Sequence, residues 1–268
     1  MATKSSSDSK NIDKIAFYDD DKHNYEEFWR GRDYEHHAEM LAIKKLLDGR
    51  HYQLAMDFGG GYGRVTPAIL EFADKVILVD PSNKQLEIGR RFLKDYSNVD
   101  YVRVDQKDSV PAADDSLDLL VMIRVSHHLA EPEPIFAEIF RSLKPGGEAV
   151  IEIANEAHFK NRVKYLKQLR GVPLESVPIG EFANGKKEVT PFYNHNPKSV
   201  SELLKDVGFQ IEDKLSVSNL RSQFIKSRVS MEQMLKIEKK LQNKLAFMDF
   251  GPSIFFLVKK PEQLGGDV

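Results

Sequence analysis

The 268-residue sequence contains no cysteine, which excludes disulfides, thiolate metal ligands and cysteine nucleophiles. It has no apolar run long enough to span a bilayer, and residues 1–10 are too polar for a signal peptide. Its formal net charge is only -2, so no overall positive field would attract nucleic acid or an anionic membrane. We therefore expect a cytoplasmic protein with no membrane or nucleic-acid partner.

The composition is that of a globular protein, with 41% hydrophobic and 30% charged residues. The length suits one large domain or one domain with insertions. We predict a disordered tail (1–13), an N-terminal helical cap (14–50), a cofactor-binding core (51–155), a cap insertion (156–197), a C-terminal part of the core (198–260) with a helical insertion (219–248), and a second tail (261–268).

Strand and helix patterns alternate in the first part of the chain. Strands are predicted at 54–58, 76–79, 99–104, 117–123 and 148–154, with helices at 64–73, 82–95 and 134–143. Strands separated by helices indicate an α/β fold with a parallel sheet covered on both faces. Beyond residue 154 we expect helices at 156–169, 199–207 and 231–248, strands at 209–217 and 253–258, and irregular structure over 171–197.

The strongest local pattern is the glycine-rich stretch from Asp57 to Gly63, which links the first strand to the first helix. A dinucleotide fingerprint fails here, because its third glycine would fall at Arg64 or Thr66. A phosphate-binding loop fails at 180–187, where the last position is lysine rather than Ser or Thr. The pattern that fits is D-x-G-x-G-x-G, formed by Asp57, Gly59, Gly61 and Gly63.

This stretch resembles motif I of the class I methyltransferases that depend on S-adenosylmethionine (SAM). The turns at 114–120 and 140–147 match those that lead into the family's fourth and fifth strands. The resemblance implies a Rossmann-like sheet of seven mostly parallel strands with an antiparallel last strand, helices on both faces, and helical or irregular cap insertions. It also implies SAM as cofactor and S-adenosylhomocysteine as product.

The same resemblance assigns cofactor contacts. Asp80, which ends the second strand, would bind the ribose hydroxyls, although a simple helix cap is the alternative. Asp105 and Gln106 would lie near the adenine. The complete set expected to bind the cofactor is Asp57, Gly59, Gly60, Gly61, Gly63, Asp80, Pro81, Asp105, Gln106 and Arg124, with Arg30 or Arg32 pairing with the SAM carboxylate.

A histidine pair follows the fourth strand. Small-molecule methyltransferases, including those that act on quinone rings, often have His-His-Leu here, and this chain has His127, His128 and Leu129. Either histidine could be a general base, or the pair could simply pack the loop. Catechol-type metal catalysis needs an acid where Arg124 stands, so we predict no catalytic metal.

Substrate contacts are expected from two segments. The N-terminal cluster contributes Tyr18, Trp29, Tyr34 and His36, which could instead be aromatic core and surface charge. The insertion contributes Tyr193 and His195, for which a structured turn is the alternative.

The sequence thus predicts a SAM-dependent methyltransferase that modifies an O or N atom of a small-molecule acceptor, as a monomer or homodimer. The alternatives are an enzyme that methylates RNA or protein, to which Arg221, Lys226, Arg228 and the lysines of 231–248 could contribute, and a SAM-binding module without catalysis. An oxidoreductase is disfavoured by the failed fingerprint.

Overall fold

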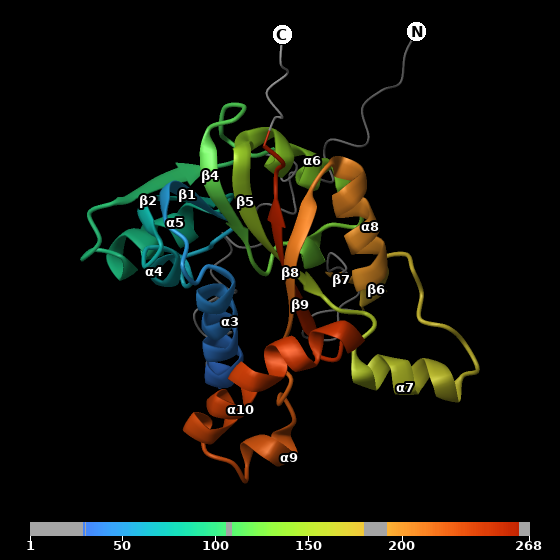
Figure 1. The fold of residues 1–268 in the computed structure, drawn as a ribbon. Helices are drawn as coiled ribbons and strands as arrows, with labels where there is room; N and C mark the ends of the chain where they lie inside the picture. The colour runs from blue at the N-terminus through green and yellow to red at the C-terminus, as the bar shows by residue number, and fades with distance from the viewer. Residues whose placement is uncertain (1–28, 30, 106–108, 180–191, 263–268) are drawn as a thin grey trace, which may run out of the picture.

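The structure, a computed structural model, describes residue 29 and residues 31–105, 109–179 and 192–262. Its central feature is a seven-stranded sheet in the order β3-β2-β1-β4-β5-β9-β8 (Figure 1). The strands are β1 (Tyr52–Phe58), β2 (Ala73–Asp80), β3 (Val99–Arg103), β4 (Leu117–Met122), β5 (Leu143–Ala154), β8 (Gln210–Val217) and β9 (Ser253–Lys259). Strands β1 to β5 are parallel, and β9 runs antiparallel to both β5 and β8. The predicted fold class is confirmed.

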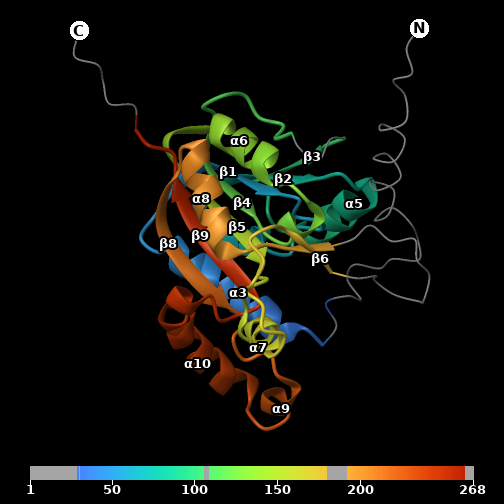
Figure 2. The same cartoon turned by 90° about the vertical axis from the view of Figure 1, so that its right-hand side faces the viewer.

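Alternation along the strands builds two apolar layers. In β4, Leu119 and Val121 belong to one buried cluster, while Leu120 and Met122 belong to the other. Helices α3 (Asp33–Leu46) and α4 (Thr66–Ile69) pack on the first layer, and α5 (Asn83–Phe92) covers the β2 and β3 end of the same face. Helices α6 (Glu133–Ser142) and α8 (Pro197–Val207) cover the opposite face (Figure 2).

The order of the strands defines where a ligand can bind. The chain runs outward from β1 to β2 and β3, then returns to the other side of β1 with β4. Loops leaving β1 and β4 therefore diverge at the carboxyl edge of the sheet, which is the usual binding position in such folds. The main functional predictions all lie on these loops or on segments that approach them.

Several element predictions were wrong in extent; for example, β5 begins at Leu143 rather than at residue 148. Helix α4 has four residues rather than the ten predicted at 64–73, because Ala73 already pairs with Tyr52 in the sheet. Helix α7 (Phe159–Lys167) begins after residue 156, since the amides of Glu156 and Ala157 bond to His195 O and Asn155 Oδ1. The segment predicted as irregular contains a small antiparallel ribbon of β6 (Val177–Ile179) and β7 (Phe192–Asn194).

The C-terminal insertion lies along α3. It contains α9 (Gln223–Lys226), α10 (Met231–Lys244) and the short 3-10 helix η3 (Ala246–Met248) (Figure 1). Gln242 Nε2 donates to the carbonyl of Ala38 at 2.8 Å, and Lys226 Nζ contacts Glu35 at 2.7 Å. Segments that are about 200 residues apart in the sequence thus form one unit beside the sheet. Within the described ranges, no helix is long and apolar enough to cross a membrane.

Candidate active site

The loop after β1 has the shape that its glycines require. Gly59, Gly61 and Gly63 have φ angles of 67°, 60° and 81°, in the left-handed region that favours glycine. A Cβ atom on Gly59 would also lie 2.4 Å from Cγ2 of Val125, which is too close for two carbon atoms. The three alternating glycines of the motif are therefore the ones that the backbone demands. Gly60, which stands between them, has no positive φ.

The carboxylate of Asp80 lies directly against this loop. Its Oδ2 accepts a hydrogen bond from the Gly61 amide at 2.9 Å, and its Oδ1 accepts one from the Ser82 amide at 2.9 Å. The hydroxyl of Ser82 caps α5 by accepting from the Gln85 amide, so the helix-cap alternative for Asp80 does not apply. Asp80 is held where two loops of the carboxyl edge meet, and its contact with ribose stays a prediction.

Asp57 is buried beneath the loop. Its carboxylate accepts a hydrogen bond from the Thr66 hydroxyl at 2.6 Å. Burial raises the pKa of Asp57 to about 7, even though Thr66 and Arg64 favour the ionised form. This position gives Asp57 a role in supporting the loop, and a direct contact with the cofactor stays a prediction.

The predicted adenine side of the site is the most open part. Asp105 follows β3, is exposed, and pairs with Arg103 at 3.3 Å. The carbonyl of Pro81 accepts a hydrogen bond from Nε of Arg103 at 3.3 Å, which ties the β2 and β3 loops together. Gln106 lies outside the described residues. The adenine contacts of Asp105 and Gln106 stay predictions.

The loop after β4 brings the histidine pair to the same edge. The rings of His127 and His128 are 4.1 Å apart, and each ring centre lies 5.0 Å from that of Phe192 on β7. Val125, two residues before His127, is the side chain that packs against Gly59. Burial, followed by the nearby His128 and Arg124, holds the pKa of His127 well below its usual range. A neutral imidazole there can accept a proton.

His195 connects the insertion to that loop. Its Nε2 lies 2.9 Å from the carbonyl of Ser126 and its Nδ1 lies 3.0 Å from Oγ of Ser176, so a single tautomer donates to the first and accepts from the second. The side chain is buried, and burial lowers its pKa. These contacts indicate a positioning residue rather than a substrate contact. Tyr193 is partly buried on β7, and its role as a substrate contact stays a prediction.

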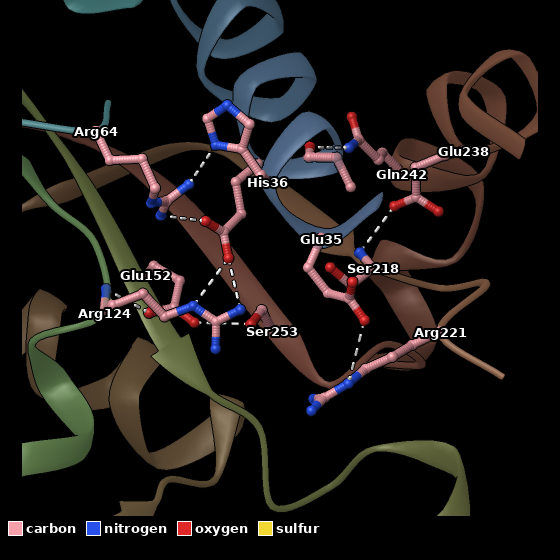
Figure 3. Close-up of polar contacts among 12 residues, drawn as sticks. Glu35, His36, Arg64, Arg124, Glu152, Ser218, Arg221, Glu238, Gln242 and Ser253 are labelled. Carbon is pink, nitrogen blue, oxygen red and sulfur yellow. Dashed lines mark hydrogen bonds and ion pairs between the residues drawn. The ribbon is translucent and has the colours of Figure 1, made fainter. Parts of the chain in front are cut away.

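The buried carboxylate of Glu39 on α3 links both loops to the N-terminal cap. Figure 3 labels its two partners, Arg64 and Arg124. Glu39 Oε2 contacts Arg64 at 2.6 Å, and Glu39 Oε1 contacts Nε of Arg124 at 2.8 Å. Arg64 directly follows the glycine loop, and Arg124 directly precedes the turn that carries the histidines. Burial raises the pKa of Glu39, but Arg124 and Arg64 more than offset this and hold it below its usual range.

Two aromatic residues of the N-terminal segment, Trp29 and His36, contact Arg64. The guanidinium of Arg64 lies 3.6 Å from the ring centre of Trp29, and its Nη1 lies 2.7 Å from Nδ1 of His36. Burial, followed by the neighbouring Arg64, lowers the pKa of His36 to about 4. Trp29 and His36 therefore lie beside both loops, where they could line an acceptor site.

The other predicted residues of the N-terminal segment lie elsewhere. Tyr34 is fully buried, and its hydroxyl donates to Glu238 at 2.7 Å and accepts from the Leu220 amide at 2.9 Å. This geometry joins α3 to α10 and points away from a substrate role. Arg32 is partly buried at the start of α3, while Tyr18 and Arg30 lie outside the described residues.

Sequence reasoning missed Glu39, Arg64 and Glu152. Glu152 is buried on β5, accepting from the Arg124 amide at 3.0 Å and from the Ser253 hydroxyl at 2.7 Å. A signal for Glu39 was present, since it shares the apolar face of α3 with Ala42, Ile43 and Leu46. A carboxylate on such a face needs a buried partner. Within the described residues, no three His, Asp or Glu side chains gather in a way that could hold a metal.

Comparison with known proteins agrees with this geometry. Residues 56–151 match the methyltransferase domain family. The chain is 34% identical over 96 residues to a demethylmenaquinone methyltransferase of Clavibacter sepedonicus, covering 36% of this chain and 39% of that one. It is 30% identical over 105 residues to the ubiquinone/menaquinone biosynthesis C-methyltransferase UbiE of Vibrio vulnificus, covering 37% and 40%. The chain thus spans about two fifths of the length of these relatives.

Solved structures share the fold over most of the chain. An S-adenosylmethionine-dependent methyltransferase of Mesorhizobium loti superposes with a TM-score of 0.54 at 17% identity, covering 83% of this chain and 97% of that one. One from Aquifex aeolicus gives 0.52 at 16% identity, covering 93% and 98%. Residues 56–151 thus resemble the methyltransferase domain family, and the sheet order and the glycine loop agree with the class I, SAM-dependent resemblance noted in the sequence. SAM is the cofactor that this resemblance implies.

Proposed function

We propose that this chain transfers the methyl group of SAM to a small-molecule acceptor. The observation that carries the proposal is the packing of Val125 against Gly59, because it sets the loop of the histidine pair directly against the glycine loop. A cofactor held by the glycine loop and an acceptor held by the histidine loop would then meet at the carboxyl edge of the sheet.

The proposed cofactor site uses the glycine loop and Asp80. Three left-handed glycines expose the main chain to a ligand, and a carboxylate held 2.9 Å from the Gly61 amide suits the vicinal hydroxyls of a ribose. We assign Arg64 and Arg124 a positioning role, since Glu39 engages both guanidinium groups.

The proposed chemistry is an in-line displacement in which bound SAM supplies an activated methyl group. His127 would accept the proton that the acceptor loses, which leaves an electron pair on the acceptor for the methyl group that bound SAM would supply. The depressed pKa of His127 keeps its imidazole in the neutral form that a general base needs near pH 7, and it also lowers the basicity of that imidazole. The two imidazole rings and Phe192 offer flat surfaces on which an aromatic acceptor could stack.

The nucleophilic atom is an open choice between two candidates. An O or N atom is the expectation from sequence. A ring carbon is the second candidate, because the matched relatives carry the names demethylmenaquinone methyltransferase and C-methyltransferase UbiE. In a hydroxylated ring, loss of the hydroxyl proton activates both the oxygen and the adjacent carbon, so the same base serves either reaction.

Calorimetry with SAM is the first test. We expect binding by the wild type and a loss of about 1–3 kcal/mol in Asp80→Ala, as for a lost hydrogen-bonded carboxylate. Turnover of catechols, amines and demethylated quinols, with NMR analysis of the products, then separates methylation at O, N and C. Binding without turnover of any small molecule would favour the RNA, protein or non-catalytic alternatives. Failure to bind SAM would overturn the proposal.

A further inference from the structure

The segment that follows β5 is strongly and uniformly basic. Between Glu156 and Glu175 the chain carries Lys160, Arg162, Lys164, Lys167 and Arg170, and no Asp or Glu. Most of these residues belong to α7, and the three lysines are exposed. Since the whole chain has a net charge of -2, this is a local concentration of positive charge.

The same segment exposes large apolar side chains. Phe159 is 51% exposed, Leu166 72% and Leu169 93%. Phe159 and Leu166 are two helical turns apart and so share one side of α7, with Lys160 and Lys167 beside them. Tyr165 is buried on another side, where it anchors the helix to the protein. Five of the twelve exposed large apolar side chains of the described chain lie within 159–179.

Leu169 also has a backbone conformation that disfavours leucine. Its φ is 53°, and the Arg170 amide donates to the carbonyl of Tyr165 at 3.0 Å, which closes the helix in a Schellman motif. Glycine is the residue preferred at that position, because a Cβ atom is strained there. At 93% exposure, Leu169 recovers little of this strain by burial within the chain.

We propose that α7 and Leu169 form a surface that docks on an anionic lipid bilayer. Phe159, Leu166 and Leu169 would enter the interfacial region, while the lysines meet lipid phosphates. Exposed aliphatic side chains flanked by lysines are typical of interfacial helices. A nucleic-acid surface would instead gain little from two exposed leucines.

This proposal departs from the expectation of no membrane partner. That expectation rested on the net charge of the whole chain and on the lack of a spanning segment, and neither property reports on a local surface. The proposal does not depend on methyl transfer. It does have a consequence for it, because α7 follows β5 directly and docking would bring the carboxyl edge of the sheet near the bilayer.

Vesicle flotation of the full chain tests the surface without any activity measurement. We expect binding to phosphatidylcholine vesicles that contain about 30% phosphatidylglycerol, and little binding to phosphatidylcholine alone. Replacing three lysines, in K160Q/K164Q/K167Q, should lower the partition coefficient about 100-fold. The matched control K236Q/K239Q/K240Q makes the same change in net charge on α10 and should leave binding within about threefold.

Leu169→Gly separates docking from folding. Glycine relieves the backbone strain, so the melting temperature should stay or rise, while vesicle binding falls about tenfold. Unchanged binding by this variant would overturn the insertion of Leu169. Equal losses in the two lysine triples, or no vesicle binding at all, would overturn the proposal. Binding of a single-stranded RNA in place of vesicles would overturn it in favour of a nucleic-acid surface.

Discussion

Strand β4 and helix α3 bury polar groups to very different degrees. In β4, five of six residues are buried and apolar, and the exception is Asp118. In α3, the buried face includes Glu35 and Glu39, whose partners lie as far away as Lys226, 191 residues along the chain. Strand β4 is held by apolar layers that a local pattern can specify. Helix α3 joins the same apolar cluster, and its contacts with α9 and α10 add ion pairs and hydrogen bonds between distant segments. The match to the methyltransferase domain family, over residues 56–151, includes β4 and excludes α3.

The largest loss of stability that would test this comparison is expected for substitution of Glu39. Glu39→Ala leaves Arg64 and Arg124 without their shared carboxylate in a largely buried place, which should cost about 3–5 kcal/mol of unfolding free energy. Urea unfolding measures this. Glu232→Ala removes an exposed carboxylate paired with Lys236 on α10 and should cost less than about 0.5 kcal/mol. Equal costs would mean that burial of the pair is unimportant.

A smaller effect is expected at Gly59 in the core. Gly59→Ala adds a Cβ that clashes with Val125 at a φ of 67°, which should cost about 2–3 kcal/mol and weaken SAM binding at least tenfold. Thermal unfolding and calorimetry measure the two effects. Gly171→Ala is the control, since a Cβ there meets no atom within 4 Å. A silent Gly59→Ala would contradict the close contact between the two loops.

The pH dependence of stability tests how a buried carboxylate of the sheet, that of Asp57, is protonated. Burial raises its folded pKa to about 7, above an unfolded value of about 3.9. The folded state therefore holds the proton more tightly, and this contribution to stability is full below about pH 4 and is lost as pH rises towards 7. Between about pH 5 and pH 7, the wild type should lose about 2 kcal/mol relative to Asp57→Asn in urea unfolding. Parallel curves for the two proteins would show that Asp57 is ionised throughout.

The smallest of these effects is expected where α3 meets α10. Tyr34→Phe removes the hydroxyl that joins Glu238 to the Leu220 amide, and should cost about 1–2 kcal/mol. SAM binding should not change, because this hydroxyl lies away from both loops. Tyr96→Phe, at an exposed position, is the control for loss of a phenol and should be nearly neutral. A selective loss of turnover in Tyr34→Phe would restore its predicted role in substrate binding.

The core could be predicted from the sequence because its signals are local. Short apolar runs located the strands, and the spacing of Gly59, Gly61 and Gly63 identified a loop whose φ angles require glycine. Asp80 was placed correctly at the end of β2, beside that loop. These features depend on neighbours in the sequence or on one strand next to another.

The cap could not be predicted in the same way. No local pattern predicts that Arg124 bonds to Glu39, 85 residues earlier, or that Tyr34 bonds to Glu238. The pairing of β6 with β7 joins two three-residue strands, each too short to show a period. His195 was singled out as a substrate contact, but its ring is engaged by Ser126 and Ser176. Such contacts are fixed by tertiary packing rather than by propensity.

The contact of Val125 with Gly59 also constrains how this protein can change over evolutionary time. A side chain at position 59 is blocked by the valine methyl groups as well as by the backbone, so the two positions are epistatic. Val125→Ala would open the space that Gly59→Ala needs, and the double variant should recover part of the loss seen in the single one. Substitutions in the loop after β4 that change the acceptor would therefore also change the contact between Val125 and Gly59, and with it the affinity of the glycine loop for the proposed methyl donor.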